Sequence, residues 1–441
     1  MLARKSMPGA VREDRSLASS TMPSHPRRPT PSTAPPARPL LRPAPHGARP
    51  HQRLFALGLT LAALTGLWWA ALLLARAQGL AVPWAVPAGL AHGLLFGLGA
   101  MPAFIAGFFF TAGPRWLQVA PDLVPMTRLH RYAGVMALGW ACAWPGLHLD
   151  ATLAGAGMVM VAVGWGGLWR LAGLLLRSSR APDRLHLRGV HGAWRVGVVS
   201  LGVTGLALLA GQFGIARLGL QGALWWSLLP IFLMALHRMV PMFADFAPWP
   251  VPERRLFWAA LAACAWGGAW ALQEVWPTPQ PMPAPLLLGR AGFEALAAAL
   301  LLAQAWRWRR MARLPLMALM LCGGVWLAVG IGLSAASAAA RGLGGPGLSL
   351  APLHAVFAGG LASLMLAQVT RVSSAHAGRA VALDRSLGGL VAILQLAVAL
   401  RLWAAMAPAA PSWVLPVAGL LWAVALTGWS LRLLGWLRPA G

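Results

Sequence analysis

The sequence predicts an all-α protein: a polytopic membrane helical bundle of about twelve transmembrane helices, with both termini in the cytoplasm. Three observations predict this fold class. The 441-residue chain is 58% hydrophobic and only 10% charged, whereas soluble domains average about 25% charged residues. Apolar stretches of membrane-spanning length recur from residue 54 onward. Arginines gather in every second loop between these stretches, as expected for cytoplasmic loops.

Residues 1–53 differ from the rest of the chain because they are rich in Pro, Arg, Ser and Ala and contain no apolar run. A segment of this composition cannot bury a core, so we expect a disordered basic tail that contacts anionic lipid headgroups. Its histidines, His25, His46 and His51, are expected to be solvated. No secretory signal precedes the first apolar segment, so the tail is expected to remain on the mature protein.

Residues 54–441 form the second predicted unit, a twelve-helix transmembrane domain. Its loops are short and rich in Pro and Gly, and none is long enough to hold a soluble domain. The third segment is short for a membrane span. The predicted spans are 54–76, 88–113, 130–147, 152–177, 191–211, 221–245, 254–276, 287–306, 314–339, 351–371, 386–407 and 411–434.

The arginines fix the predicted orientation of these spans. The loops after segments two, four, six, eight and ten each hold at least two arginines, whereas the intervening loops hold at most one. Cytoplasmic loops are enriched in Lys and Arg, so these loops and both termini are predicted to be cytoplasmic. Topology thereby accounts for the formal charge of +26, and no nucleic-acid partner is expected.

Segment ten places a histidine near each face of the membrane. It begins near His354, runs through an apolar stretch to Arg371 and is followed by His376. At 1.5 Å per helical residue, His354 to Arg371 covers about 26 Å, close to the thickness of a bilayer's hydrocarbon core. Imidazole is a common ligand of haem iron and copper, so both histidines are candidate metal ligands. They would lie about 33 Å apart in one helix, which excludes a shared metal.

His92, at the start of segment two, is the third candidate metal ligand. The predicted topology places it on the same outer side as His354, which makes it the expected partner of that residue. Gly93 and Gly97 follow His92, and Gly359 follows His354. Small residues at this spacing let a second helix approach closely, and they would equally admit a flat macrocycle. Both interpretations stay open.

His237 and Arg238 are candidate cofactor-binding residues at the inner end of segment six. Pro241 follows them, and a proline in a span frees a backbone carbonyl and favours irregular backbone that lines a cavity. The two side chains could contact a ligand there. Alternatively, Arg238 extends toward the lipid headgroups.

His376 lies in a polar stretch with Arg371 and Arg379 on either side. Three hydroxyl residues belong to the same stretch, namely Thr370, Ser373 and Ser374. Paired arginines with hydroxyl groups are typical of sites for anions and haem propionates. The alternative is a basic cytoplasmic loop that serves only topology. His237 is a further candidate member of this inner cluster.

Three stretches of the chain resemble the NnrS family of bacterial membrane proteins. Residues 91–97 and 105–116 are similar to the family's HAHEMLFG and IAGFLLTAVPNW, and residues 238–243 are similar to its RVIPFF. Residues 354–379 resemble the family's HA…G…MILAVMTRxxxGHTGR, the most specific of the three motifs. The family has twelve spans, so the resemblance covers almost the whole chain beyond the tail.

The resemblance implies a haem- and copper-containing protein of the bacterial inner membrane, associated with nitric oxide metabolism and protection from nitrosative stress. Haem is the expected cofactor, and copper is left open. The expected partners are the lipid bilayer, nitric oxide or another diatomic gas, and a redox partner that the sequence does not identify. Gly93 replaces a glutamate of the family motif and Leu90 replaces a histidine, which puts one metal site in doubt. The supported cofactor-binding residues are His92, His354, His376, Arg238, Arg371 and Arg379.

Two other functions compete with this prediction. A haem–copper oxidase-like nitric oxide reductase needs adjacent histidines on segment seven, which has none. A metal-free transporter would carry acidic groups near the middle of the membrane, whereas Asp245, Glu274 and Glu294 are expected near segment ends. A haem-binding membrane protein is therefore the favoured prediction, and the sequence leaves open whether it turns over a substrate.

Overall fold

The computed structural model describes residues 50–243, 254–276, 282–313, 315–380, 382–407 and 409–437. Within these ranges the chain forms helices joined by short connections, and no strand occurs among them. The predicted all-α class is therefore confirmed. The predicted tail lies outside the described residues up to residue 49, and so does Asp245.

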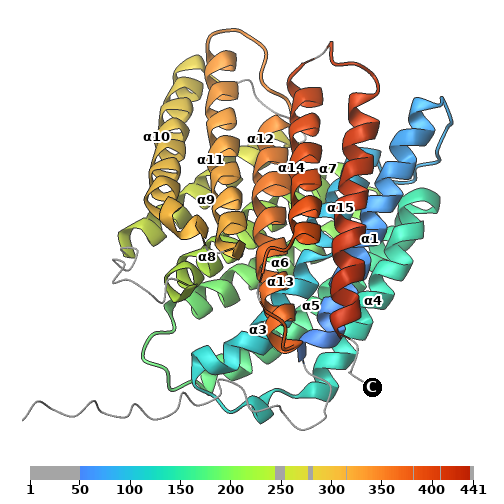
Figure 1. The fold of residues 1–441 in the computed structure, drawn as a ribbon. Coiled ribbons are helices and arrows are strands. Elements are labelled where there is room, and N and C mark those ends of the chain that lie inside the picture. Colours follow the sequence, from blue (N-terminus) through green and yellow to red (C-terminus); the bar gives the residue numbers. More distant parts are fainter. Residues whose placement is uncertain are drawn as a thin grey trace, which may run out of the picture. The chain divides into compact units, whose positions relative to one another are not determined.

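The helical runs follow the twelve predicted segments one for one (Figure 1). Short 3₁₀ turns, η1 (Pro121–Leu123) and η3 (Arg309–Arg313), lie in two of the connections. The runs are α1 (Pro50–Ala77); α2 (Ala88–Leu98) with α3 (Met101–Leu117); α4 (Met126–Leu149); α5 (Ala151–Arg177); α6 (Leu185–Leu209); α7 (Phe213–Ala223), η2 (Leu224–Leu228) and α8 (Leu229–Phe243); α9 (Arg254–Glu274); α10 (Ala284–Trp308); α11 (Pro315–Gly342); α12 (Ala351–His354), η4 (Ala355–Leu361) and α13 (Ala362–His376); α14 (Arg385–Met406); and α15 (Val414–Leu437).

Ten of these helical runs are long and apolar enough to cross a membrane, and α4 and α9 are outside that set. Large apolar side chains on several runs face outward. Leu206, Leu296 and Leu431, for example, keep 62%, 60% and 64% of their surface exposed. In water such exposure would be costly, whereas in lipid it is expected. The protein is therefore a multi-pass membrane protein, and the cytoplasmic placement of its termini stays a prediction.

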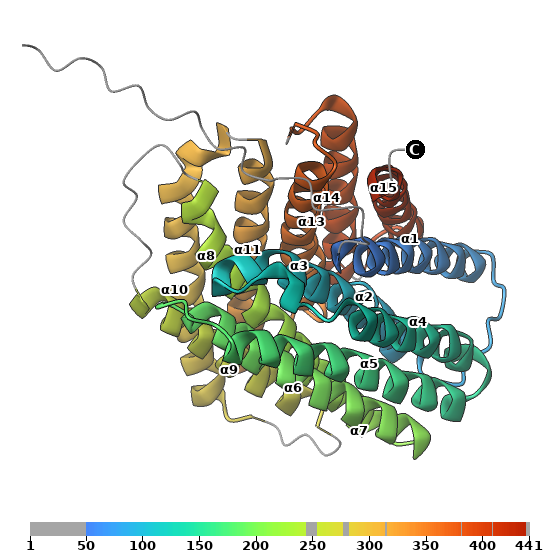
Figure 2. The ribbon, with the colours of Figure 1, turned by 90° about the horizontal axis from the view of Figure 1, so that it is seen from below.

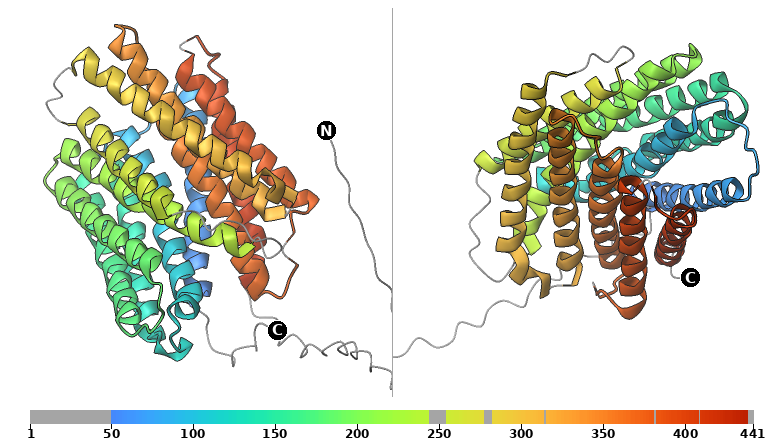
Figure 3. Two further views of the ribbon diagram at one scale, coloured as in Figure 1. Left: turned by 90° about the vertical axis from the view of Figure 1, so that its left-hand side faces the viewer. Right: turned by 90° about the horizontal axis from the view of Figure 1, so that it is seen from above.

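Helices that follow each other in the chain pack in pairs, namely α4 with α5, α5 with α6, α10 with α11 and α14 with α15. α1 packs along α15, so the first and last helices lie side by side (Figures 1 and 2). The α10–α11 pair is visible in yellow and orange in both views of Figure 3.

Glycines set the closest of these approaches, between α4 and α5. A Cβ atom added at Gly139 would lie 2.7 Å from the carbonyl oxygen of Gly157. A Cβ atom at Gly157 would lie 2.4 Å from the backbone nitrogen of Ala143. Small residues that let backbones touch are the usual means of helix association in lipid, where no hydrophobic effect drives it.

Two of the spans contain a π-helical turn. One is η2, between α7 and α8, and the other is η4, which begins directly after His354. Segment ten is therefore continuous from Ala351 to His376, as predicted, but it is not a uniform α-helix. Single π turns inside α-helices occur frequently at functional sites.

Candidate functional site

The rings of His92 and His354 face each other between α2 and α12. Their centroids lie 6.1 Å apart, and their planes differ by 26°. The predicted pairing of these residues is therefore confirmed as a contact, although they are far apart in the sequence. Their role as metal ligands stays a prediction.

The surroundings of His92 hold its ring in place on two sides. Trp69 of α1 packs at 4.2 Å between ring centroids, and Phe96, one turn along α2, packs at 4.3 Å. The Nδ1 atom of His92 is buried and has no hydrogen-bond partner among the described residues. A buried polar nitrogen without a partner is costly, so this atom is a candidate for a ligand contact.

Hydrogen bonding fixes the tautomer of His354. Its Nδ1 lies 2.8 Å from the carbonyl oxygen of Leu350. A carbonyl can only accept, so Nδ1 must carry the proton, and Nε2 of the neutral ring keeps its lone pair. Metal-binding histidines usually donate their other ring N–H to a carbonyl or carboxylate in this way. Arg401 of α14 adds a positive charge that acts on both His92 and His354.

The glycines near the two histidines serve helix packing. A Cβ atom at Gly93 or Gly97 would lie 2.6 or 2.7 Å from a side-chain atom of Leu220 or Leu224, respectively. A Cβ atom at Gly359 would lie 2.7 Å from the indole of Trp326. Neighbouring side chains therefore occupy these glycine faces, and helix packing is the better of the two interpretations that the sequence left open.

A hydrogen-bonded group holds Trp326 against η4. Its Nε1 donates to Oε1 of Gln395 at 2.6 Å, and Nε2 of Gln395 donates to the hydroxyl of Ser363 at 3.1 Å. The three residues belong to α11, α14 and α13, so the group ties these helices together just beyond the π-helical turn. It thereby supports the backbone that carries His354.

A second pair of imidazoles lies at the other end of segment ten. The rings of His376 and His51 have centroids 4.1 Å apart, with planes tilted by 48°. Nδ1 of His376 lies 2.8 Å from the carbonyl oxygen of Val372 and must donate to it, as Nδ1 of His354 does to Leu350. His51 is only 2% exposed, so the expectation that it is solvated in the tail is wrong. α1 begins at Pro50 and places His51 in its first turn.

The polar stretch around His376 divides between the core and the surface. Thr370, Ser373 and Ser374 are at most 2% exposed, and the Thr370 hydroxyl accepts a 2.9 Å hydrogen bond from Nε1 of Trp429. The three hydroxyl groups are therefore buried in the bundle, and the Thr370 hydroxyl joins α13 to α15. Their predicted role in an anion site stays a prediction. Arg379 lies just past α13, with its guanidinium 5.3 Å from the ring of Trp436. Arg371 lies on α13, more than one turn before His376.

His237 pairs with His186 of α6. Nε2 of His186 and Nδ1 of His237 are 2.8 Å apart, and the ring centroids are 5.0 Å apart. The adjacent Arg238 places its guanidinium 5.1 Å from the ring of Trp116 and 3.9 Å from a carboxylate oxygen of Asp183. The Arg238 side chain is 21% exposed and lines a small cavity, so it is not extended into the lipid headgroups. His237 lies beside His186, and the predicted association of His237 with His376 stays a prediction.

Other histidines serve structure. Trp68 donates to Nε2 of His148 at 2.9 Å, and Nδ1 of the same ring donates to the carbonyl oxygen of Pro83 at 2.9 Å. Both ring nitrogens of His148 are thus engaged, which leaves none for a metal. Among the residues that the structure describes, no group of three or more His, Cys, Asp or Glu side chains is placed to hold a metal ion. The candidate sites are therefore pairs of imidazoles.

Sequence reasoning missed several partners of the candidate ligands. Trp69, Arg401, His51 and His186 come from helices remote in the sequence, and no local motif connects them to His92, His354 or His237. For His51 a local signal did exist. Pro50 immediately precedes it, and proline is favoured at the first position of a helix.

Comparison with known proteins identifies the family of the chain. A family model described as NnrS protein matches residues 46–440, nearly the whole chain. A comparison with curated proteins gave no match.

Proposed function

We propose that this chain, which belongs to the NnrS family, binds haem or copper within the membrane and acts in nitric oxide metabolism or in protection from nitrosative stress. The observation that carries the proposal is the His92–His354 pair, in which two imidazoles from different helices face each other at a centroid distance of 6.1 Å. We place the protein in the bacterial inner membrane, as expected for the family. Its partners would be the lipid bilayer, nitric oxide or another diatomic gas, and a redox partner.

The centroid distance of the His92–His354 pair is in the range in which one metal ion would bind a nitrogen of each ring. A metal–imidazole bond is about 2.0 Å long, and the ring centroid lies about 1.1 Å beyond the nitrogen. Two imidazoles that bound the same ion would have centroids at most about 6 Å apart. His92 and His354 would hold the iron of a haem or a copper ion, because imidazole is a common ligand of both. The unpartnered Nδ1 of His92 and the fixed tautomer of His354 support the same assignment.

The His51–His376 pair fits a different arrangement. Its ring centroids are only 4.1 Å apart. His51 and His376 would hold a single small ion such as copper, for which imidazole is a common ligand. Arg371 and Arg379 belong to the same end of segment ten and would bind an anionic group there.

Bound ferrous haem or copper would supply a centre that binds nitric oxide. The protein's own residues would orient that centre and exclude water from it. Trp69 and Phe96 cover His92, and Arg401 supplies a positive charge that a carboxylate of the cofactor could neutralise. The apolar helices around the site would let a small uncharged gas partition into it from the bilayer.

The test is to quantify iron, copper and haem in one purified sample of the full chain. We expect a Soret band and a bound metal. The variants His92→Ala and His354→Ala should each lose or shift the haem spectrum, and free imidazole should restore it in part. The matched control is His148→Gln, which replaces another histidine of the predicted outer side whose two ring nitrogens are already engaged. A folded wild-type protein without haem or metal would refute the proposal, and an unchanged spectrum in both alanine variants would refute the assignment of the pair.

A further inference from the structure

A cavity of about 320 Å³ lies among α8, α9, α10, α11 and α12. Neither the His92–His354 nor the His51–His376 pair lines it, whereas His237 does. Its walls are predominantly apolar and aromatic, with Trp225, Trp266, Phe293 and Trp308 among the lining side chains. Cavities of roughly 300–1,000 Å³ with such walls and a few polar groups are typical of sites for small organic ligands.

One face of α10 lines the cavity along most of the helix. Arg290, Glu294, Ala297, Leu301, Gln304 and Trp308 all contribute to its wall, at the three- and four-residue spacing of a single helix face. From Arg290 to Trp308 this face is about 27 Å long. α10 is long and apolar enough to cross a membrane, whose hydrocarbon core is about 30 Å thick, so a cavity along this face would lie within the bilayer. It therefore suits a ligand with a long apolar tail.

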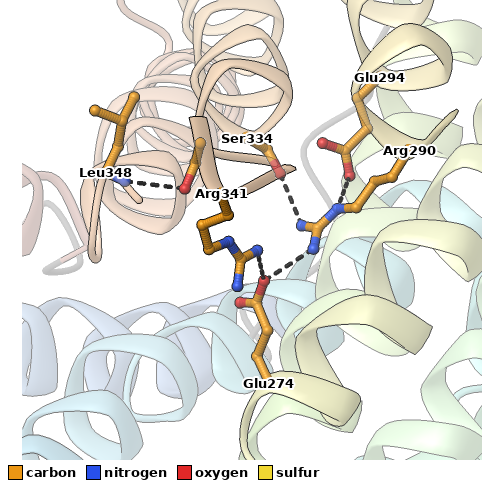
Figure 4. A network of polar contacts seen from close by, with 7 residues as sticks. Glu274, Arg290, Glu294, Ser334, Arg341 and Leu348 are labelled. Atoms are coloured by element: carbon orange, nitrogen blue, oxygen red, sulfur yellow. Dashed lines mark hydrogen bonds and ion pairs between the residues drawn. The ribbon is translucent and has the colours of Figure 1, made fainter. Parts of the chain in front are cut away.

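An ion-pair network contributes polar groups to the wall of the cavity, and its Arg290–Glu294 pair is buried. Figure 4 shows the network. Arg290 donates from Nε to Glu294 at 2.8 Å, from Nη1 to Glu274 at 2.9 Å and from Nη2 to the hydroxyl of Ser334 at 3.0 Å. Glu274 also accepts from Arg341 at 2.7 Å. Two carboxylates and two guanidinium groups leave no net charge, so this part of the cavity wall favours neither a free cation nor a free anion.

The network leaves one strong acceptor unsatisfied. Oε2 of Glu294 is buried and has no hydrogen-bond partner among the described residues, and the Glu294 side chain is only 7% exposed. Gln221 and Trp225 also line the cavity. Oε1 of Gln221 and Nε1 of Trp225 are likewise buried and have no hydrogen-bond partner among the described residues. A buried carboxylate oxygen without a donor costs free energy, so a ligand that supplies an O–H group would be stabilised there. A hydroxyl also accepts, which would satisfy an indole N–H.

We propose that this cavity binds a membrane-soluble quinol, with a ring hydroxyl donating to Oε2 of Glu294 and the apolar tail along α10. A quinol combines the properties that the cavity selects: no net charge, a flat ring that packs against indoles, hydroxyl donors and a long apolar tail. The inference concerns binding only, and it stands whether or not the histidine pairs hold metal.

The test measures binding of a benzoquinol with a ten-carbon tail to the purified full chain in phosphatidylcholine nanodiscs. Its dimethyl ether has the same ring and tail but no donor. Since a hydrogen bond to a charged acceptor is strong, the quinol should bind about tenfold more tightly than the ether, or better. In Glu294→Gln, the amide oxygen should accept from Arg290 and turn the NH₂ group toward the ligand. The variant should then prefer the oxidised quinone, whose carbonyl accepts.

A pair of glycine substitutions separates the cavity from the general fold. Gly324 lines the cavity, and a Cβ atom there would meet nothing within 4 Å, so Gly324→Leu should fill the site and abolish binding without a clash. Gly292 of α10 is equally open but lies outside the lining, so Gly292→Leu should bind as the wild type does. Equal affinity for quinol and ether, or unchanged binding in Gly324→Leu, would overturn the proposal.

Discussion

Replacing Arg290 by methionine should strongly destabilise the protein, because it leaves a charge buried without a partner. The Arg290 and Glu294 side chains are each 7% exposed, and Oε1 of Glu294 accepts only from Arg290 among the described hydrogen bonds. Glu274 keeps one of its two hydrogen-bond donors in this variant, because Arg341 continues to donate to it. Removing one partner of a buried ion pair typically costs about 3–5 kcal/mol, so we expect Arg290→Met to lower the free energy of unfolding by about that amount.

The measurement is the free energy of unfolding in mixed micelles titrated with sodium dodecyl sulfate. Arg341→Met is the matched control, because the Arg341–Glu274 pair is 34% and 39% exposed and should contribute about 1 kcal/mol or less. The double variant Arg290→Met/Glu294→Leu removes both buried charges and should recover most of the loss, to within about 1 kcal/mol of the wild type. If the double variant is as unstable as Arg290→Met, the loss does not come from the unpaired carboxylate and the reasoning is refuted.

Two further predictions concern packing and pH. Gly157→Leu should separate α4 from α5, because a Cβ atom there would collide with the backbone of Ala143. We expect the free energy of unfolding in the same assay to fall by about 2 kcal/mol or more. A variant as stable as the wild type would contradict this prediction. Hydrogen bonds from Arg432 lower the pKa of Asp384 to about 2. The resulting stabilisation should be present above the ordinary pKa of an aspartate, about 3.9, and should be lost as pH falls from about 4 to 2. Because Asp384 is exposed, the effect on the free energy of unfolding should be small. Asp384→Asn should abolish this part of the pH dependence. If the variant loses stability between pH 4 and pH 2 as the wild type does, the Asp384–Arg432 pair is not its cause.

The sequence predicts the helices well because the bilayer imposes their length and apolarity. Each of the twelve segments found from composition coincides with a helical run of the structure. The pairing of His92 with His354 could also be inferred, because the arginine pattern places both on one side. The sequence does not predict which face of a helix packs against its neighbours, because that face depends on contacts between segments distant in the chain. For that reason the sequence left Gly93 and Gly97 ambiguous and showed no sign of His186 beside His237.

The acidic residues illustrate the same limit. The sequence predicts Glu294 near a segment end, because the apolar run begins at residue 287. α10 begins at Ala284, and Glu294 lies in its third turn, 5% exposed and paired with Arg290 four residues earlier. An Arg and a Glu at this spacing lie on one helix face and neutralise each other, so an apolar helix can hold both away from its end. The network with Glu274 and Arg341 becomes visible only when α9 and α11 are placed beside α10.

Segment ten carries its two histidines to separate sites at its two ends. In an ideal α-helix the positions of His354 and His376 are about 40° apart around the axis, so both side chains would point to nearly the same face. A π turn inserts the equivalent of one residue and rotates the helix before it by about 100° relative to the helix after it. η4 lies directly between the two histidines. After this shift the two histidines are still only about 60° apart around the axis, but they lie about 33 Å apart along it. His354 therefore meets His92 of α2 while His376 meets His51 of α1, with centroid distances of 6.1 Å and 4.1 Å. The two imidazole pairs on one span result mainly from its length, and η4 adjusts the direction of His354 relative to His376.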